Sequence, residues 1–437
     1  MMRSGLRLVL ACLSLVGVPA TAQGPLHVDI TQGEASPLPI AIPEVSSGPM
    51  LGAPNAGDIG LALSHIIRDD LLSAGLYRLV TVGERFSVDQ EVVFAPFMRA
   101  GAQALVIGRA QAADEGRLTY ECLLYDVFGG RVEASQKIVV SMAEWRRAAH
   151  KCADMVFSVT TGDPGHFDTR LLFVAGDGQP PARSAHLVAA DFDGANATAL
   201  TRGRQLVAMP DFSPDSRRLV FMSYEEMQPK LLVADTRSGQ ATSLNIPQGV
   251  PSAPRFSPDG RSVIFSLARD GDADIYTIDL ASGSVRQLTN TAGADTSPSY
   301  APDGMSIVFE SDRSGEQQIY VMAADGSRQR RISFGTGAYG SPSWSPRNDM
   351  IAYTHIESGQ LRVGVMKHNG SGRRIITNGP HDEDPSWALS GRAIAFQRTN
   401  AGGSRSMLWI TDLTGKAQHP VRTQGSASDP AWSGKRP

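Results

Sequence analysis

The chain has 437 residues, and its 41 Lys and Arg against 44 Asp and Glu give a formal net charge of −3. The basic residues are scattered rather than clustered, so we expect no nucleic-acid partner. The length is sufficient for two domains with sizeable cores.

The first 22 residues have the pattern of a secretory signal peptide. Arg3 and Arg7 precede an apolar run over 8–18, and small residues then lead to a cleavage position after Ala22. A lipoprotein signal in which Cys12 carries the lipid is a less favoured alternative. The apolar run is shorter than the roughly 20 residues that a membrane span needs, so we expect no transmembrane segment.

Two cysteines remain after removal of that signal, Cys122 and Cys152. An oxidising compartment permits a disulfide between them. Two buried thiols are at least as plausible, because the sequence does not report the distance between their Cα atoms.

The region that follows predicts a small α/β domain over 23–165 in which helices cover one sheet. Its first residues, 23–34, alternate apolar and polar side chains and form either an edge strand or an arm that docks elsewhere. Apolar spacing predicts helices over 58–74, 92–100 and 142–159, and strands over 77–82, 104–108, 118–126 and 131–141. In the first helix we expect Asp69 and Asp70 to face outward.

A repeat dominates the rest of the chain, from 166 to 437. The phrase Pro-x-Phe-Ser-Pro-Asp and its eroded copies have leading prolines at 210, 254, 298, 342, 385 and 430, in steps of 44, 44, 44, 43 and 45. A period of about 40 to 45 residues with four short strands per unit is typical of propeller blades. We therefore predict a six-bladed β-propeller.

The ends of the repeat series indicate how the ring closes. The last copy stops after its first strand, at Trp432. Strand-like runs at 171–174, 186–189 and 197–200 precede the first full copy and supply the three missing strands. One blade would then be shared between the two ends of the propeller, which removes exposed sheet edges.

Residue types that could carry chemistry have simpler structural explanations. Asp215, Asp259 and Asp303 recur in turns that need no ion. We interpret His150 and His166 as packing or hydrogen-bonding residues, because no metal-ligand spacing includes them.

The propeller has one dense acidic run, 381–384, which we interpret as a solvated loop. Trp344, Trp387 and Trp432 occupy one repeat position and are expected to pack between blades.

An enzyme is the rival class. A peptidase of this repeat type would need a G-x-S-x-G nucleophile elbow, which the sequence lacks, and the α/β domain has no glycine-rich phosphate loop after a strand. A propeller lyase or hydrolase acting on a small substrate in the channel remains the alternative. We assign no catalytic residue, no cofactor and no metal.

We expect each leading proline to open an innermost strand, which places the residues before it in loops at one mouth of the channel. These mouth residues are mostly small, polar or acidic. The candidate contacts, which also include two larger apolar residues, are Met209, Val250, Ala253, Thr296, Ser297, Ser341, Asp384 and Asp429.

The junction 146–154 and 161–170, with the runs 58–60, 101–108 and 124–127, resembles the TolB family of the bacterial Tol-Pal envelope system. The likeness extends over the whole mature chain. It implies a periplasmic, non-catalytic adaptor that supports outer-membrane integrity and cell division. Family members often carry a histidine where this chain has Val250.

The resemblance also implies two protein partners. The propeller mouth would receive Pal, the peptidoglycan-associated lipoprotein, with Ala253 and Thr296 among its contacts. The arm 23–34 would bind TolA through apolar side chains, namely Pro25, Leu26, Val28 and Ile30.

Overall fold

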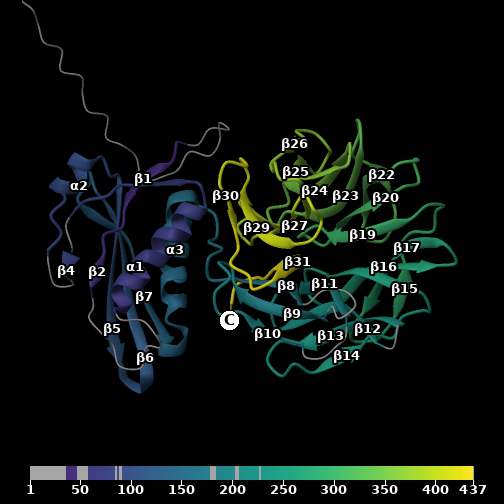
Figure 1. Cartoon of the computed structure of the whole chain (residues 1–437), viewed down its shortest axis with the longest axis horizontal. Helices are drawn as coiled ribbons and strands as arrows, with labels where there is room; N and C mark the ends of the chain where they lie inside the picture. The colour runs from purple at the N-terminus through teal and green to yellow at the C-terminus, as the bar shows by residue number, and fades with distance from the viewer. Residues whose placement is uncertain are drawn as a thin grey trace, which may run out of the picture.

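The computed structural model describes residues 36–46, 58–83, 86–87, 91–177, 184–201, 206–225 and 228–436. The expected signal peptide 1–22 and arm 23–34 lie outside these residues. Figure 1 shows two bodies side by side, a layered α/β unit and a ring of β-sheets. None of the described helices has the length and apolar character needed to cross a membrane.

The α/β unit is built on one five-stranded sheet in the order β3-β1-β5-β6-β7. Strand β1 pairs in parallel with β3 and β5, and β5, β6 and β7 pair antiparallel. Two very short strands, β2 and β4, pair separately. The elements are β1 Leu38–Ala41, β2 Val45–Ser46, α1 Ile59–Ser73, β3 Tyr77–Leu79, β4 Phe86–Ser87, α2 Ala95–Ala100, β5 Ala104–Ala113, β6 Arg117–Asp126, β7 Arg131–Ser141 and α3 Arg146–Thr161, with short 3-10 helices at Asp114–Gly116 and Met142–Glu144.

These elements confirm the three predicted helices and the hairpin of β6 and β7, with shifted ends. The second helix begins only at Ala95, beside a proline in its first turn, where the missing N–H is tolerated. One expectation is wrong: Asp70 is only 2% exposed, because it faces α3 and pairs with His150 instead of pointing to solvent.

Helices α1 and α3 lie between the sheet and the ring (Figure 1). Cys122 on β6 and Cys152 on α3 form a disulfide with a Cα–Cα distance of 5.7 Å, which decides between the two alternatives left by the sequence. A single apolar cluster runs from this sheet and its helices to Ala388, Leu408 and Trp432 of the propeller. The two bodies therefore share a continuous core.

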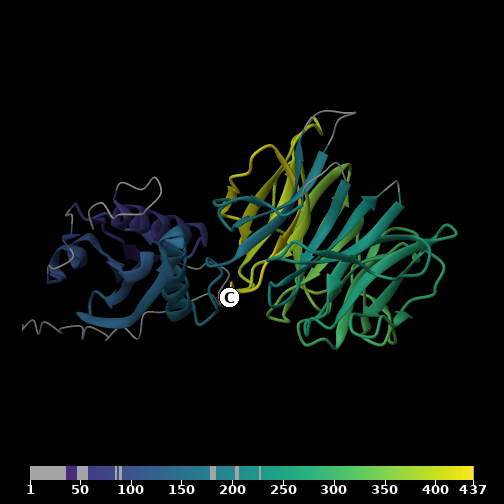
Figure 2. The ribbon, with the colours of Figure 1, turned by 90° about the horizontal axis from the view of Figure 1, so that it is seen from below.

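The ring consists of sheets whose neighbouring strands run antiparallel within each set of four, and Figure 2 shows it turned by 90° from the first view. Three sheets hold four consecutive strands each, namely β11 Leu206–Phe212, β12 Arg218–Glu225, β13 Gln228–Asp235 and β14 Ala241–Ser243; β15 Val250–Phe256, β16 Ser262–Arg269, β17 Asp272–Asp279 and β18 Val285–Gln287; and β19 Asp295–Tyr300, β20 Ser306–Ser311, β21 Gln318–Ala323 and β22 Arg330–Arg331.

Eight further strands form one sheet, in which the single bridge Leu361↔His381 joins two sets of four. The first set is β23 Ala338–Trp344, β24 Met350–Glu357, β25 Gln360–Lys367 and β26 Arg374–Ile375, and the second is β27 His381–Trp387, β28 Ala393–Thr399, β29 Ser406–Asp412 and β30 Gln418–Pro420.

The remaining sheet confirms the predicted closure. Its order is β10-β9-β8-β31, and it combines β8 Arg170–Asp177, β9 Ser184–Asp191 and β10 Thr198–Ala199 with the last strand, β31 Ser426–Trp432. The pairs Ala431↔Leu172 and Trp432↔Leu171 join the two ends of the ring. The innermost strand thus comes from the C-terminal end and the other three from the start of the propeller.

Candidate functional site: the propeller channel

A leading proline lies in mid-strand in each of the channel-lining strands β11, β15, β19, β23, β27 and β31. The register shifts by one residue there in every case, for example between Ser252 and Arg255 on β15, which marks a β-bulge. The expectation that these prolines open the strands is therefore wrong. An innermost strand is the edge of its blade, so a proline without an N–H is tolerated at the bulge on that edge.

The residue before each leading proline has positive φ, between 45° and 54°. These residues come together around the channel and line a cavity of about 110 Å³. We call them the channel ring: Met209, Ala253, Ser297, Ser341, Asp384 and Asp429. The prediction that these six residues lie close together at the channel is confirmed, but they lie inside strands rather than in mouth loops.

Ala253 and Thr296, the two residues singled out as partner contacts, are less accessible than expected. Ala253 is 9% exposed, and its N–H points to the sulfur of Met209 at 3.2 Å. Thr296 lies within β19 and donates its hydroxyl to Glu310 at 2.6 Å. Val250, at the start of β15, is 48% exposed and does lie at the mouth.

Hydrogen bonds link the ring from blade to blade. The N–H of Ser341 donates to Glu310 at 2.6 Å, and the Ser341 hydroxyl donates to Asp384 at 2.7 Å. The N–H of Asp384 donates to Thr354 at 3.2 Å, and that of Asp429 to Gln397 at 3.3 Å. A side chain on the second strand of one blade thus accepts the bulge N–H of the next.

The acidic run 381–384 is not a solvated loop, since it belongs to β27. Asp382 is fully buried and accepts two bonds from Arg398, at 2.6 and 2.8 Å. Glu383 is half-buried near Asp384 and Asp429. Burial raises the pKa of Glu383 to about 7, and the neighbouring Asp384 and Asp429 carboxylates add to the rise.

Arg255 is a site residue that the sequence analysis missed. It lines the acidic cavity and also a wider one of about 300 Å³ toward the other end of the channel. Burial raises the pKa of Asp429 to about 6, nearby Asp384 adds to this, and Arg255 opposes it. The signal was available, because Arg255 is the only basic residue found directly after a leading proline.

The wider cavity is lined by the aromatic repeat positions, including Phe256, Trp344, Trp387 and Trp432. These tryptophans are at most 9% exposed, and each lies in an apolar core cluster, as expected for residues packed between blades. The turn aspartates also behave as expected. Asp259 accepts from Ser257 at 2.6 Å and from the N–H of Arg261 at 3.0 Å.

The two ends of the channel differ in their surroundings. The α/β unit contacts the end where the first strand of each blade turns into the second. There Asp163, just after α3, pairs with Arg347 and with Arg392, the latter at 2.7 Å. Strands β11 and β15 begin at the opposite end, where Leu206 and Val250 are 47% and 48% exposed. That end is the mouth.

This architecture and both of its parts match known proteins. A model described as the TolB beta propeller domain matches residues 157–436, and one described as the TolB amino-terminal domain matches 26–132. The chain belongs to the TolB family. Its propeller is the TolB propeller, and its α/β unit is the TolB amino-terminal domain.

Individual TolB relatives agree with this assignment. The chain is 45% identical over 230 residues to the "Tol-Pal system protein TolB" of Rhizorhabdus wittichii and 43% identical over 237 residues to that of Dinoroseobacter shibae. Each alignment spans about half of the chain, 51% and 52%, and 52% of the relative. The crystal structure of TolB from Acinetobacter baumannii is 27% identical with a TM-score of 0.81, covering 94% of this chain and 100% of that one.

Proposed function

We propose that this TolB-family chain is a non-catalytic periplasmic adaptor of the Tol-Pal system that binds Pal at the propeller mouth and TolA through the arm 23–34. In this role it supports outer-membrane integrity and invagination during cell division. The observation that carries the proposal is the match to both TolB domain models in their family order. The relatives' own names place them in the Tol-Pal system.

The proposal includes the organisation of the chain. Export follows cleavage after Ala22, the amino-terminal domain covers 23–165, and the propeller covers 166–437 with six blades. Six is supported by the six repeat copies and by the eight-stranded sheet, whose two sets of four strands are joined by one bridge. The end of α3 at Thr161 supports a boundary just after it.

Exposed apolar side chains favour the mouth as the Pal-binding surface. Leu206, Val250 and Phe334 are between 47% and 57% exposed, and all three precede or begin innermost strands on that side. Exposed apolar side chains at this end offer surface that a protein partner can bury. Behind them the channel ring adds the carboxylates Asp384 and Asp429.

Val250→Arg tests the mouth without disturbing the core. A surface change of this kind alters the folding free energy by no more than about 0.5 kcal/mol. At a central contact it can cost about 2 kcal/mol of binding, roughly a 30-fold loss of Pal affinity. Met305→Arg is the matched control, because Met305 is 72% exposed in the turn at the opposite end. Equal Pal binding by both variants and the parent would place the Pal site elsewhere.

The arm is tested separately. Removal of 23–34 is expected to abolish TolA binding while Pal binding and the melting temperature stay unchanged, because a reversibly docked arm contributes little to the core. Undiminished TolA capture by the shortened protein would exclude Pro25, Leu26, Val28 and Ile30 as the contacts. That result would leave the Pal proposal standing.

A further inference from the structure

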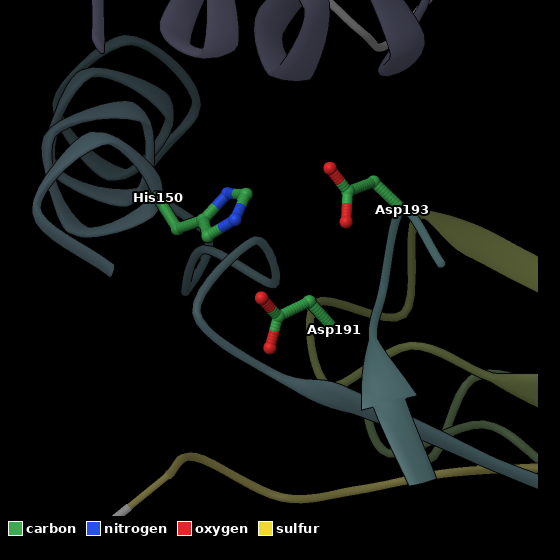
Figure 3. A group of neighbouring side chains, drawn as sticks. All are labelled: His150, Asp191 and Asp193. Atoms are coloured by element: carbon green, nitrogen blue, oxygen red, sulfur yellow. The ribbon is translucent and has the colours of Figure 1, made fainter. Parts of the chain in front are cut away.

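Three side chains from the two domains converge where α3 meets the turn after β9 (Figure 3). His150 lies on α3, Asp191 ends β9, and Asp193 follows in the turn. Each offers one ligand atom, and these atoms all lie within 4.8 Å of one another. Neither the adaptor role nor the Pal and TolA sites uses this cluster.

The imidazole of His150 is buried against a carboxylate. Its Nδ1 lies 2.8 Å from Asp70 on α1, and the two side chains are 1% and 2% exposed. A carboxylate accepts only, so Nδ1 carries a hydrogen and Nε2 is the ring nitrogen left to bind an ion. Nε2 is buried and has no hydrogen-bond partner among the described residues. The free edge of the ring points toward the two aspartates (Figure 3).

We propose that His150, Asp191 and Asp193 bind one divalent cation of the zinc type between the two domains. A metal-ligating histidine typically donates its other ring N–H to a carboxylate, as His150 does to Asp70. One imidazole and two carboxylates are ligands that Zn²⁺ accepts, with water in the fourth position.

The geometry requires only a modest adjustment. Tetrahedral zinc with bonds of about 2.1 Å places its ligand atoms about 3.4 Å apart. The atoms here lie within 4.8 Å of one another, so they must approach by up to about 1.4 Å. Asp193 can supply much of this movement, because its side chain is 31% exposed in a turn.

Arg146 is the competitor for this site. Its guanidinium pairs with Asp193, and its Nε lies 3.9 Å from Asp191 without a hydrogen-bond partner among the described residues. Asp191 also binds Arg436 at 2.8 Å. With Asp70, the cluster holds three carboxylates against two guanidiniums. If a divalent cation takes the place of the Arg146 guanidinium, this cluster becomes neutral. Arg146 can move aside because its side chain is 21% exposed.

A path for the ion is present beside the cluster. A cavity of about 210 Å³ opens between α1 and the β29–β30 region and is lined by Asp70, Arg146, Asp193 and His419 among others. Because His150 belongs to the amino-terminal domain and the aspartates to the propeller, a bound ion would fasten the two domains together. Binding only to this folded arrangement raises the melting temperature.

The test titrates untagged full-length mature protein, stripped by a chelator, with Zn²⁺ by calorimetry and with Co²⁺ by visible absorption at neutral pH. We expect one ion per chain and a raised melting temperature. His150→Gln is expected to remove binding. Asp193→Asn is the second variant, because it changes a partly exposed turn residue and leaves the fold intact while it too removes binding. Asp70→Asn weakens binding about 10- to 100-fold.

Arg146→Gln is the variant that separates a metal site from an ordinary ion-pair cluster. If Arg146 competes with the ion, its loss tightens Zn²⁺ binding, whereas loss of a merely structural residue would not. His368→Gln, an exposed histidine after β25, is the control and leaves binding unchanged. Absence of saturable binding by the parent, full binding by folded Asp193→Asn, or weaker binding by Arg146→Gln would each overturn the proposal.

Discussion

The three repeat tryptophans allow a sharp test of what holds the blades together. Trp344, Trp387 and Trp432 occupy one repeat position and are 9%, 7% and 7% exposed, but their indole N–H groups differ. That of Trp387 donates to the Ser343 carbonyl at 2.9 Å, and that of Trp432 to the Thr169 hydroxyl at 2.7 Å. The Trp344 N–H is buried and has no partner among the described residues.

Replacement of each tryptophan by phenylalanine removes the N–H and a similar volume from three equally buried sites. The destabilisation from lost packing is therefore nearly the same in all three variants. Trp387→Phe and Trp432→Phe also lose a hydrogen bond with a net value of about 1 kcal/mol. Trp344→Phe instead removes an unpaired buried donor, which relieves about 1–3 kcal/mol. We expect Trp344→Phe to be about 2–4 kcal/mol less destabilising than the other two.

Equilibrium unfolding in denaturant, followed by far-UV circular dichroism, measures the three free energies of unfolding. Comparison within the series cancels the shared loss of volume, so no separate estimate of the cavity term is needed. If Trp344→Phe destabilises the protein as much as Trp387→Phe and Trp432→Phe, the indole hydrogen bonds do not distinguish the blades and this reasoning fails.

Three further changes probe other parts of the fold. Cys122→Ser opens a loop of about 30 residues and should lower the free energy of unfolding by about 3–4 kcal/mol. An unchanged free energy would mean that the parent protein does not form the disulfide. Asp163→Ala removes charged hydrogen bonds to two blade turns and should lower the free energy of unfolding in denaturant by about 2 kcal/mol; an unchanged midpoint would show that the pairs with Arg347 and Arg392 do not stabilise the fold. In the folded protein the pKa of Asp429 is about 6, above its unfolded value. Ionisation of this buried carboxyl therefore destabilises the fold as pH rises from about 4 to 6. Asp429→Asn should therefore stabilise the protein above pH 6 by about 1–2 kcal/mol, after allowance for screening in the channel, and by almost nothing below pH 4.

Much of the fold could be predicted from the sequence because its signals are local and repeated. The leading prolines fix the period, and the pairing of β31 with β8 followed from the incomplete last copy. The position of each proline inside its strand could not be predicted in the same way. A proline at a strand start and a proline at an edge bulge have the same local sequence, and only the register of the neighbouring strand decides between them.

Contacts between residues far apart in the sequence were the other failure of prediction. Asp70 follows Asp69 on a helix and looked solvent-exposed, yet it is buried because α3 presents His150 to it from 80 residues away. Trp432 and Thr169 are 263 residues apart. Hydrophobic periodicity reports that a side chain is buried, but it does not report which distant element buries it or supplies its polar partner.

The channel ring itself is explained by structure before any partner is considered. Non-glycine residues with positive φ carry backbone strain of about 1–3 kcal/mol and persist only where the surroundings fix them. Here the side chains of Met209, Glu310, Thr354 and Gln397 accept the bulge N–H groups of the neighbouring blade. A bulky substitution in the ring, unlike the isosteric Asp429→Asn, therefore disturbs the joint between blades as well as any contact with Pal, and cannot separate the two. A substitution on the exposed rim can separate these two effects. For that reason a change at Val250, rather than at Ala253, tests whether the mouth binds a partner.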